Sequence, residues 1–355
     1  MSSSRHTEAT RVLALAPNWL GDAVMCTPAL RALHLRHSGA RLTVAGRAGV
    51  CALLQDLPWI DGLVSIPAQP SVAQMTRLAK ELRPHGRDLV AVFPHSFRAA
   101  LLARLIGGRR RIGYARNGRA WLLTDTLAPH REQGRITPVY MSREYLDLVA
   151  LVGCEDDGAG LELGVSEAAI GETASRLAGS GPLIGIAPGA AFGPSKRWMP
   201  EAFAETANLI AAACNARFLL LTGPGEEDIR DTIRRHAAVN FLTLPPVDDG
   251  IAVLKAALSQ VDLLICNDSG PRHIAVAFKR PIVCIMGPTS PRYSEGPYEI
   301  GQVLRQPLEC SPCQKPVCPL EHHRCMHDIT PEQAAQTALA YLAESAQASA
   351  AHNAR

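Results

Sequence analysis

Short apolar runs alternate with segments of helical periodicity along the first half of the chain. The runs are rich in Val, Ile, Leu and Ala, and the segments between them repeat apolar residues every three or four positions. This alternation predicts parallel strands buried on both faces, in a doubly wound α/β sheet. The predicted strands cover 11–16, 41–45, 63–66 and 89–93, and the predicted helices cover 48–54, 72–82 and 97–106.

The alternation restarts in the second half of the chain. It predicts strands at 183–187, 218–222, 240–243, 263–266 and 282–286, and helices at 201–213, 226–236, 251–258, 271–278 and 331–343. Two similar halves suit two domains in a chain of 355 residues. We predict domains at 11–170 and 181–330, a terminal helix at 331–345, and a flexible Ala- and Ser-rich tail at 346–355.

A few segments fit the pattern less simply. A helix follows the first strand, and Pro28 lies either in its first turns or at its true start. The basic, Gly-containing segment 109–134 predicts surface loops, and 140–152 predicts a helix. The Gly-, Ser- and Pro-containing segment 171–182 predicts the junction between the domains.

The stretch 261–288 shows a pattern typical of a ligand site. An apolar strand runs into the polar turn Asn267–Gly270, a helix then starts at Pro271, and a second apolar strand follows. In parallel α/β sheets, ligands bind at the carboxyl ends of the strands, and a helix start with small residues can hold phosphate. A helix capped by Asp268 or Ser269 without any ligand would show the same pattern.

Positive charge is concentrated in the first half of the chain. The formal net charge is +3, yet the stretch Arg83–Arg143 contains 12 arginines and 3 acidic residues. This surplus indicates either an anionic partner or a solvated arginine surface. The first residues lack the apolar core of a signal peptide, and no window reaches the roughly 18 apolar residues of a membrane span. We therefore expect a cytoplasmic protein.

Candidate chemical groups follow the predicted strands. Asp22 lies just beyond the first strand, where its carboxylate could act as a general base or cap a helix. The Gly-rich loop 188–198 lacks the spacing of a P-loop, but its Lys196 could neutralise a leaving phosphate or simply lie at the surface. Glu226 and Glu227 follow the next strand, where an acid binds ribose hydroxyls or stabilises a helix start.

Four of the ten cysteines cluster near the C-terminal end, with histidines between them. Their spacing, C-x2-C-x4-C-x6-C, could form a tetrahedral site of four thiolates around zinc. Such a site would be structural, because four sulfur ligands leave no open position for chemistry. Reduced cysteines or a redox disulfide are the alternatives. The candidate ligands are Cys310, Cys313, Cys318 and Cys325.

The motifs of this chain resemble those of the ADP-heptose:lipopolysaccharide heptosyltransferases of Gram-negative bacteria, those of type II in particular. The resemblance covers nearly all of 11–343. It implies a GT-B fold, in which two Rossmann-like domains face each other across a cleft, with the acceptor on the N-terminal domain and the nucleotide-sugar on the C-terminal one. The motifs are NWLGDAVM (18–25), GAAFGPSKRWMP (189–200), NDSGPRHIAVA (267–277), GPTSP (287–291) and CSPCQKPVCPLEHHRCM (310–326).

The resemblance also implies roles for individual residues. Asp22 matches the catalytic aspartate, and Lys196 matches the catalytic, phosphate-binding lysine. Glu227 is an alternative to Glu226 as the ribose-binding acid. Where some relatives have hydroxyl residues, this chain has Ala190 and Ala191, so only backbone N–H groups can bind phosphate there. The implied donor-binding residues are Gly189, Ala190, Ala191, Lys196, Glu226, Asp268, Ser269, Gly270 and His273, and the implied acceptor-binding residues are Arg98, Arg116 and Arg119.

The implied reaction moves a heptose from ADP-L-glycero-D-manno-heptose to the first heptose of the lipopolysaccharide inner core, with inversion. Asp22 would deprotonate the attacking hydroxyl. No cofactor is implied for catalysis, because Lys196 and the helix start at 269–271 would replace a metal ion at the diphosphate. The acceptor, a heptosylated Kdo–lipid A, would bring the protein to the inner face of the inner membrane.

Several other functions fit parts of the pattern. Within the family, the acceptor could be that of heptosyltransferase I or III. Another GT-B enzyme, or an epimerase that uses a nucleotide-sugar, would share the architecture. A zinc-stabilised nucleic-acid-binding protein would use the arginines and cysteines, although an aromatic content of 5% offers few side chains for base stacking.

Overall fold

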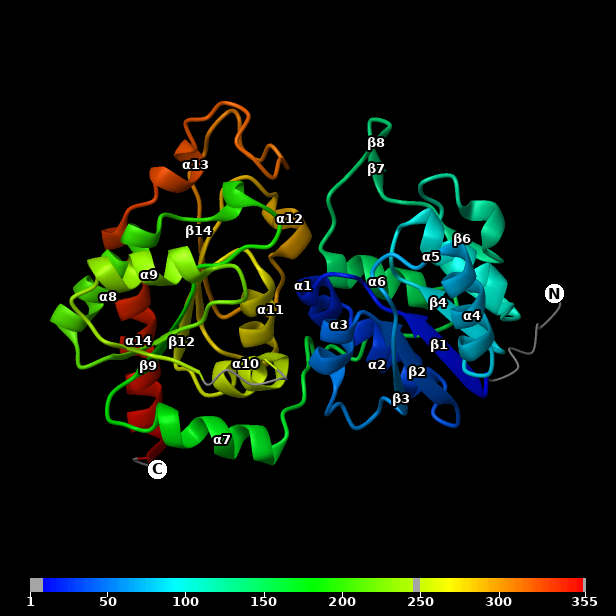
Figure 1. Ribbon diagram of the computed structural model, residues 1–355, viewed down its shortest axis with the longest axis horizontal. Helices are drawn as coiled ribbons and strands as arrows, with labels where there is room; N and C mark the ends of the chain where they lie inside the picture. The colour runs from blue at the N-terminus through cyan, green and yellow to red at the C-terminus, as the bar shows by residue number, and fades with distance from the viewer. Residues whose placement is uncertain (1–8, 245–249, 354–355) are drawn as a thin grey trace. The chain divides into compact units, whose positions relative to one another are not determined.

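Parallel sheets form the centre of both halves of the chain. The computed structural model describes residues 9–244 and 250–353. Two compact units divide after Gly164, and each has its own six-stranded parallel sheet (Figure 1). The predicted doubly wound α/β class is therefore confirmed. None of the helices in the described ranges is long and apolar enough to cross a membrane.

The sheet of the first unit has the strand order β3-β2-β1-β4-β5-β6. All four residues of β4 are buried, as expected for a central strand covered on both faces. The strands are β1 (Arg11–Leu15), β2 (Arg41–Gly46), β3 (Gly62–Ser65), β4 (Leu89–Val92), β5 (Arg110–Tyr114) and β6 (Asp125–Leu127), beside a small hairpin of β7 (Arg131–Glu132) and β8 (Arg135–Ile136). The helices are α1 (Leu20–Met25), α2 (Thr27–Arg36), α3 (Ala48–Leu54), α4 (Val72–Leu82), α5 (Phe97–Ile106), the 3-10 turn η1 (Ala120–Leu122) and α6 (Met141–Ala150).

The sheet of the second unit repeats this topology, in the order β11-β10-β9-β12-β13-β14. Trp198 and Phe203 pack edge to face, with ring centroids 5.0 Å apart, at the centre of its core. The strands are β9 (Leu183–Ala187), β10 (Arg217–Leu220), β11 (Phe241–Leu242), β12 (Leu263–Asn267), β13 (Ile282–Ile285) and β14 (Gly301–Leu304). The helices are α7 (Glu167–Leu177), η2 (Pro194–Lys196), α8 (Pro200–Ala213), α9 (Glu227–His236), α10 (Gly250–Leu258), α11 (Gly270–Ala277), α12 (Pro291–Ser294), α13 (Arg324–His327) and α14 (Pro331–Asn353).

Strand order reverses at one place in each sheet. In the first unit the reversal lies between β1 and β4, whose last residues pair as Leu15 with Val92. In the second unit it lies between β9 and β12, where Ala187 pairs with Cys266. After the two strands of such a pair, the chain continues on opposite faces of the sheet. This leaves a crevice at the carboxyl ends of the two strands. Each unit therefore has one preferred place for a ligand.

Nearly all predicted strands and helices are present, most of them within two residues of the predicted ends. Pro28 lies at the start of a separate helix, α2, so the second of the two interpretations is confirmed. The prediction of loops for 109–134 is wrong, because this segment contains β5, η1, β6 and the first strand of the hairpin. Its arginines obscured the short apolar core of β5, of which only Ile112, Gly113 and Tyr114 are buried.

Two other segments also differ from prediction. Part of the segment taken as a loose linker belongs to α7, which Ser166 caps by accepting a hydrogen bond from Ala169 N, with Gly171 inside the helix. The flexibility expected of the tail from 346 stays a prediction, and the sequence predicts that the last helix ends between 343 and 345. Instead α14 continues to Asn353, beside the sheet that carries β12 (Figure 1). The stretch 344–353 contains four alanines, and alanine has the highest helix propensity, which favours this continuation.

Candidate active site

Lys196 and Asp268 meet at the strand reversal of the second unit. Lys196 follows β9 and Asp268 follows β12. The Lys196 Nζ atom lies 2.6 Å from Asp268 Oδ2 and donates a second hydrogen bond to the Asp268 carbonyl oxygen at 3.1 Å. The structure thus brings together two residues that the sequence separates by 72 positions.

Further side chains hold the Asp268 carboxylate in place. Arg272 Nη1 donates to Asp268 Oδ1 at 2.8 Å, and Thr289 Oγ1 donates to Asp268 Oδ2 at 2.8 Å. The second arm of Arg272 binds both carboxylate oxygens of Glu299, at 3.0 and 2.8 Å. Arg272 is fully buried, and removing one partner of such a buried pair typically costs about 3–5 kcal/mol.

The charges of this cluster balance one another. Burial would raise the pKa of Asp268, but the cations Lys196 and Arg272 outweigh it and hold that pKa well below its usual range. Burial, followed by the charge of Arg272, lowers the pKa of His273 to about 3, so this ring is neutral near pH 7. Two cations therefore face two carboxylates, and an arriving diphosphate would meet Lys196 in an orientation already fixed by Asp268.

The start of α11 differs from the capped helix that the sequence allowed. Ser269 occupies the N-cap position without a side-chain capping bond, and the Asp268 side chain is bound to Lys196 and Arg272 instead. Within the described residues, the buried Ser269 Oγ and His273 Nδ1 have no hydrogen-bond partner. Buried polar atoms of this kind cost about 1–3 kcal/mol unless a ligand or water satisfies them. Together with the uncapped helix start, they favour an anion site over an ordinary capped turn.

Asn267 fixes both ends of the loop that carries Lys196. Its buried side chain donates to the Pro188 carbonyl at 2.6 Å and accepts from the Trp198 backbone N–H at 3.1 Å. Trp198 is itself anchored, because its Nε1 donates to the Ile329 carbonyl at 3.1 Å. The ring of Phe192 lies 5.3 Å below Lys196 Nζ, within cation–π distance. The position of Lys196 is thus set by the core of the unit.

The cysteine-rich segment braces the same loop. Ser195 N donates to the Pro316 carbonyl at 3.0 Å, and Ser195 Oγ donates to the Lys315 carbonyl at 2.6 Å. The ring of His323 lies 2.6 Å from the Ser195 carbonyl through Nε2. The segment 310–325 therefore contributes to the geometry of Lys196 although it is far away in sequence.

The four clustered cysteines line one small hollow of about 20 Å³ together with His322 and His323. Burial, and then the charges of Cys313, Cys318 and Cys310, raises the pKa of Cys325 to about 11. The side chains do not converge as ligands do, however. Cys310 Sγ lies 4.0 Å from His322 Nε2, and in residues 9–244 and 250–353 no three His, Cys, Asp or Glu side chains are grouped as a metal site. The zinc site stays a prediction.

Glu226 lies against the Gly189 loop. Its Oε2 accepts from Gly223 N at 2.8 Å, and a Cβ atom added at Gly189 would lie only 2.0 Å from its Oε1. Glu227 instead accepts from Gly225 N at 3.2 Å, inside its own turn. Of the two acids, Glu226 is therefore the one that lies against the Gly189 loop.

Asp22 lies in the first turn of α1, not at its N-cap, which is Trp19. The carboxylate is half-buried, and its charge adds to burial in raising the pKa of both Cys26 and Tyr145. Asp22 thus lies near Tyr145 on α6, close to the strand reversal between β1 and β4. Asp22 therefore lies near the edge of the sheet where parallel α/β folds bind ligands.

The arginines predicted to bind an acceptor have different environments. Arg119 is fully buried and donates to the carbonyls of Tyr114, Pro94 and Ser96, so it holds the loop after β4 and does not face a ligand. Burial, and then the charge of Arg116, lowers the pKa of Arg119 to about 10. We therefore correct the role of Arg119 from contact to positioning.

Arg116 lies at the same edge of the sheet, with two residues that the sequence did not point to. Its Nη1 lies 3.1 Å from His95 Nδ1 and 3.4 Å from Glu144 Oε1, while His95 Nε2 lies 2.8 Å from Glu144 Oε1. A guanidinium can only donate, so Nδ1 of His95 accepts this hydrogen bond. The Nε2 atom of His95 is close to Glu144 but is not aligned for a hydrogen bond with it. Throughout the described ranges, every side-chain hydrogen bond and ion pair of Arg116 uses Nη1, so these contacts do not engage the other edge of its guanidinium.

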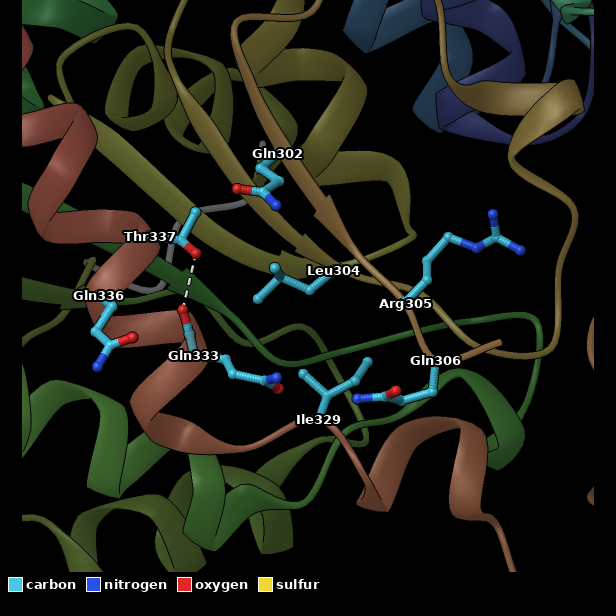
Figure 2. A pocket seen from close by; sticks show the side chains of 8 residues that line it. All are labelled: Gln302, Leu304, Arg305, Gln306, Ile329, Gln333, Gln336 and Thr337. Atoms are coloured by element: carbon cyan, nitrogen blue, oxygen red, sulfur yellow. Dashed lines mark hydrogen bonds between the residues drawn. The ribbon is translucent and has the colours of Figure 1, made fainter. Parts of the chain in front are cut away.

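Another hollow of the second unit, of about 220 Å³, contributes nothing to this chemistry. It is lined mainly by neutral amides between β14 and α14, and Figure 2 shows Arg305 pointing away from them. Thr337 Oγ1 donates to the Gln333 carbonyl along its wall. The cation and the open backbone N–H groups that could hold an anion lie elsewhere, at Lys196 and the start of α11.

Comparison with known proteins gives a consistent result. The model of glycosyltransferase family 9 (heptosyltransferase) matches residues 75–324. Lipopolysaccharide heptosyltransferase 2 of Escherichia coli K12 is 26% identical over 341 residues, which cover 91% of this chain and 96% of that protein. Lipooligosaccharide heptosyltransferase 2 of Campylobacter jejuni is 27% identical over 322 residues, which cover 89% and 94%.

Solved structures agree with these similarities. The structure of E. coli ADP-heptose LPS heptosyltransferase II superposes with a TM-score of 0.73 and 25% identity, over 94% of this chain and 99% of that one. A glycosyl transferase of family 9 from Veillonella parvula superposes with a TM-score of 0.82 and 21% identity, over 97% and 100%, which supports the fold.

Proposed function

Because the chain belongs to glycosyltransferase family 9, the heptosyltransferase family, we propose that it transfers a heptose from ADP-L-glycero-D-manno-heptose to the first heptose of the lipopolysaccharide inner core. The observation that carries the donor half of this proposal is the Lys196–Asp268 pair beside the uncapped start of α11. The acceptor half rests on similarity to heptosyltransferases 2 over about nine tenths of the chain.

The second unit binds the donor through its diphosphate. Lys196 and the open backbone N–H groups at the start of α11 hold the phosphate oxygens, and Ser269 Oγ and His273 Nδ1 supply further polar contacts. Glu226, lying over Gly189, binds the ribose hydroxyls. Lys196 stabilises the charge that develops on ADP as the glycosidic bond breaks, so no metal ion is needed for this step.

Asp22 acts as the base of the first unit. It takes the proton from the acceptor hydroxyl as that oxygen attacks the anomeric carbon, while the bond to ADP breaks on the opposite face and the configuration inverts. A second catalytic carboxylate is unnecessary, because the leaving group departs as an anion that cations already hold.

Arg116 binds an anionic group of the acceptor. The inner core carries phosphates and Kdo carboxylates, and the free edge of a guanidinium binds either one with two parallel hydrogen bonds. His95 and Glu144 fix the opposite edge of Arg116 and so set its direction. Arg98, exposed at the start of α5, adds positive charge to the same region. With this acceptor, the protein works at the inner face of the inner membrane.

A direct test combines the donor and the acceptor. Purified protein is incubated with ADP-heptose and a core acceptor that carries a single heptose. The mass of the product is then measured by mass spectrometry. We expect one added heptose, with ADP-heptose raising the melting temperature more than UDP-sugars do. Transfer only to an acceptor without heptose would indicate heptosyltransferase I, and stabilisation by UDP-sugars alone would contradict the proposed donor.

A further inference from the structure

An exposed apolar strip runs along α5 and onto η1 in the first unit. Phe97, Leu101 and Leu105 recur every fourth residue, so they lie along one side of the helix. Phe97 is 41% and Leu105 36% exposed, whereas the outer side of a surface helix is usually polar. The ring of Trp121 lies 6.2 Å from that of Phe97 and is 71% exposed. We call these four residues the α5 strip.

Positive charges border the α5 strip. Arg98 follows Phe97, is exposed, and donates to the Pro70 carbonyl, close to Val72, which is another exposed apolar residue. Arg104 precedes Leu105 and is also exposed. Helix α5 contains no acidic residue. Apolar and aromatic side chains flanked by arginines therefore form one continuous feature.

This combination suits an anionic lipid surface. Aromatic rings prefer the headgroup level of a bilayer, and each nearby arginine gains from the negative surface potential of anionic lipids. A nucleic acid would use charge with aromatic stacking, and would gain nothing from burying Leu101 and Leu105. A scattered exposed apolar residue needs no partner. Three exposed apolar residues together with the half-buried Leu101, all flanked by arginines, do indicate one.

The strip also begins at the edge of the sheet where the acceptor is expected. Phe97 follows directly after the loop 94–96, which carries His95 and whose carbonyls bind Arg119 and Asn117. That loop leaves β4 at the strand reversal, on the same edge as Asp22. A surface docked through the strip would hold this edge close to the bilayer.

We propose that the α5 strip, with Arg98 and Arg104, docks the protein on the surface of an anionic lipid bilayer. Phe97 and Trp121 enter the headgroup region, and the two arginines bind lipid phosphates. The part that concerns a lipid-linked acceptor rests on the proposed function, whereas vesicle binding itself does not. Docking would let the enzyme act on an acceptor that stays anchored in the membrane.

The first test is co-sedimentation of the full chain with vesicles of phosphatidylethanolamine and phosphatidylglycerol, compared with vesicles of phosphatidylcholine. We expect partition into the anionic vesicles to fall about tenfold or more in the double variant Phe97→Ser, Trp121→Ser, and several-fold in Arg104→Gln. The double variant Ile170→Ser, Ile300→Ser removes two exposed apolar residues of the second unit and should bind like the wild type. Melting temperatures of all variants control for folding.

Activity separates this inference from the proposed function. On a water-soluble acceptor without lipid, the Phe97→Ser, Trp121→Ser variant should keep kcat/KM within about twofold, while transfer to acceptor embedded in vesicles should fall in parallel with binding. Wild-type protein that transfers heptose but does not bind anionic vesicles, or that binds RNA in preference to them, would overturn the docking proposal alone. Vesicle binding without any heptose transfer would overturn the proposed function and leave the docking surface standing.

Discussion

Lys196 illustrates how one side chain is prepared for a ligand that carries opposite charge. Its ammonium group is held at 2.6 Å from Asp268, whose other oxygen binds the buried Arg272. In the function that we propose, the ammonium group is therefore oriented before a diphosphate arrives, and little reorganisation is needed during the reaction. Burying the charge of Arg272 costs free energy, and its ion pair with Glu299 offsets part of that cost.

Replacing Lys196 tests this role at the scale of one residue. We expect Lys196→Ala to weaken ADP binding about tenfold and to lower kcat by a factor on the order of 10². Calorimetry of ADP binding and steady-state transfer rates measure the two effects. Lys279→Ala, a change of an exposed lysine in the same unit, should alter neither. Unchanged donor affinity and rate in Lys196→Ala would reject the assignment.

At the scale of elements, the start of α9 lies against the loop after β9, and this contact sets the position of Glu226, the acid that we propose binds ribose. Gly189 leaves room for the Glu226 carboxylate, which a methyl group would displace. We expect Gly189→Ala to raise the KM for ADP-heptose about tenfold with little change in melting temperature, because the flexible carboxylate can move aside. Gly223→Ala is the matched control, since its Cβ would lie 3.8 Å from Glu226 Oε2 and disturb nothing. Equal KM values for the two variants would argue against Glu226.

The segment that follows α6 is tied to α2 by one buried cation. Arg31 binds Asp157 at 2.6 Å and Glu162 at 3.0 Å, and the hydrogen bond from Arg31, opposed by partial burial, leaves the pKa of Asp157 at about 2. Because folding lowers this pKa, the Asp157 carboxylate stabilises the folded state at pH values above its unfolded pKa of about 4. This stabilisation is lost as the pH falls toward the folded pKa of about 2. The free energy of unfolding should therefore drop between pH 4 and 2, and the drop should be shallower in Arg31→Gln. A pH profile of urea unfolding measures this, and identical slopes would contradict it.

The elements were largely predictable because their apolar periodicity is strong, and the errors have local causes. In β5, arginines lead into a short buried core, so charge concealed a strand. In α7, Gly171 suggested a linker although Ser166 caps the helix. The site residues that follow strands were predictable from topology, whereas His95, Glu144 and Glu299 were not. These residues belong to no sequence motif, and their contacts join positions 21 to 49 residues apart. Only the folded chain brings them together.

At the scale of the whole molecule, both units have the same sheet topology, and the function that we propose gives them different tasks. Each places its functional groups where the strand order reverses, at β1 and β4 in one and at β9 and β12 in the other. The second unit adds the cysteine-rich segment, which bonds to Ser195 beside Lys196. Through these contacts the cysteine-rich segment helps to set the position of Lys196.

The cysteine cluster leads to a prediction about metal content. A tetrahedral zinc site requires four sulfur atoms about 3.8 Å from one another, and the four cysteines line one hollow. We expect elemental analysis to find about one zinc per chain, and Cys310→Ser or Cys318→Ser to lose it with a lower melting temperature and a higher KM for ADP-heptose. Metal-free protein with four freely titrating thiols, and full activity in both variants, would contradict a structural zinc.

The measurement that bears most directly on the account is the single-turnover rate of heptose transfer in Asp22→Asn, together with its affinity for ADP-heptose. The amide keeps the size of the carboxylate but cannot accept a proton, so the loss should appear in the chemical step. We predict a rate lower by a factor on the order of 10² or more, with donor affinity within about twofold of the wild type. A near-normal rate in Asp22→Asn would contradict the assignment of Asp22 as the base.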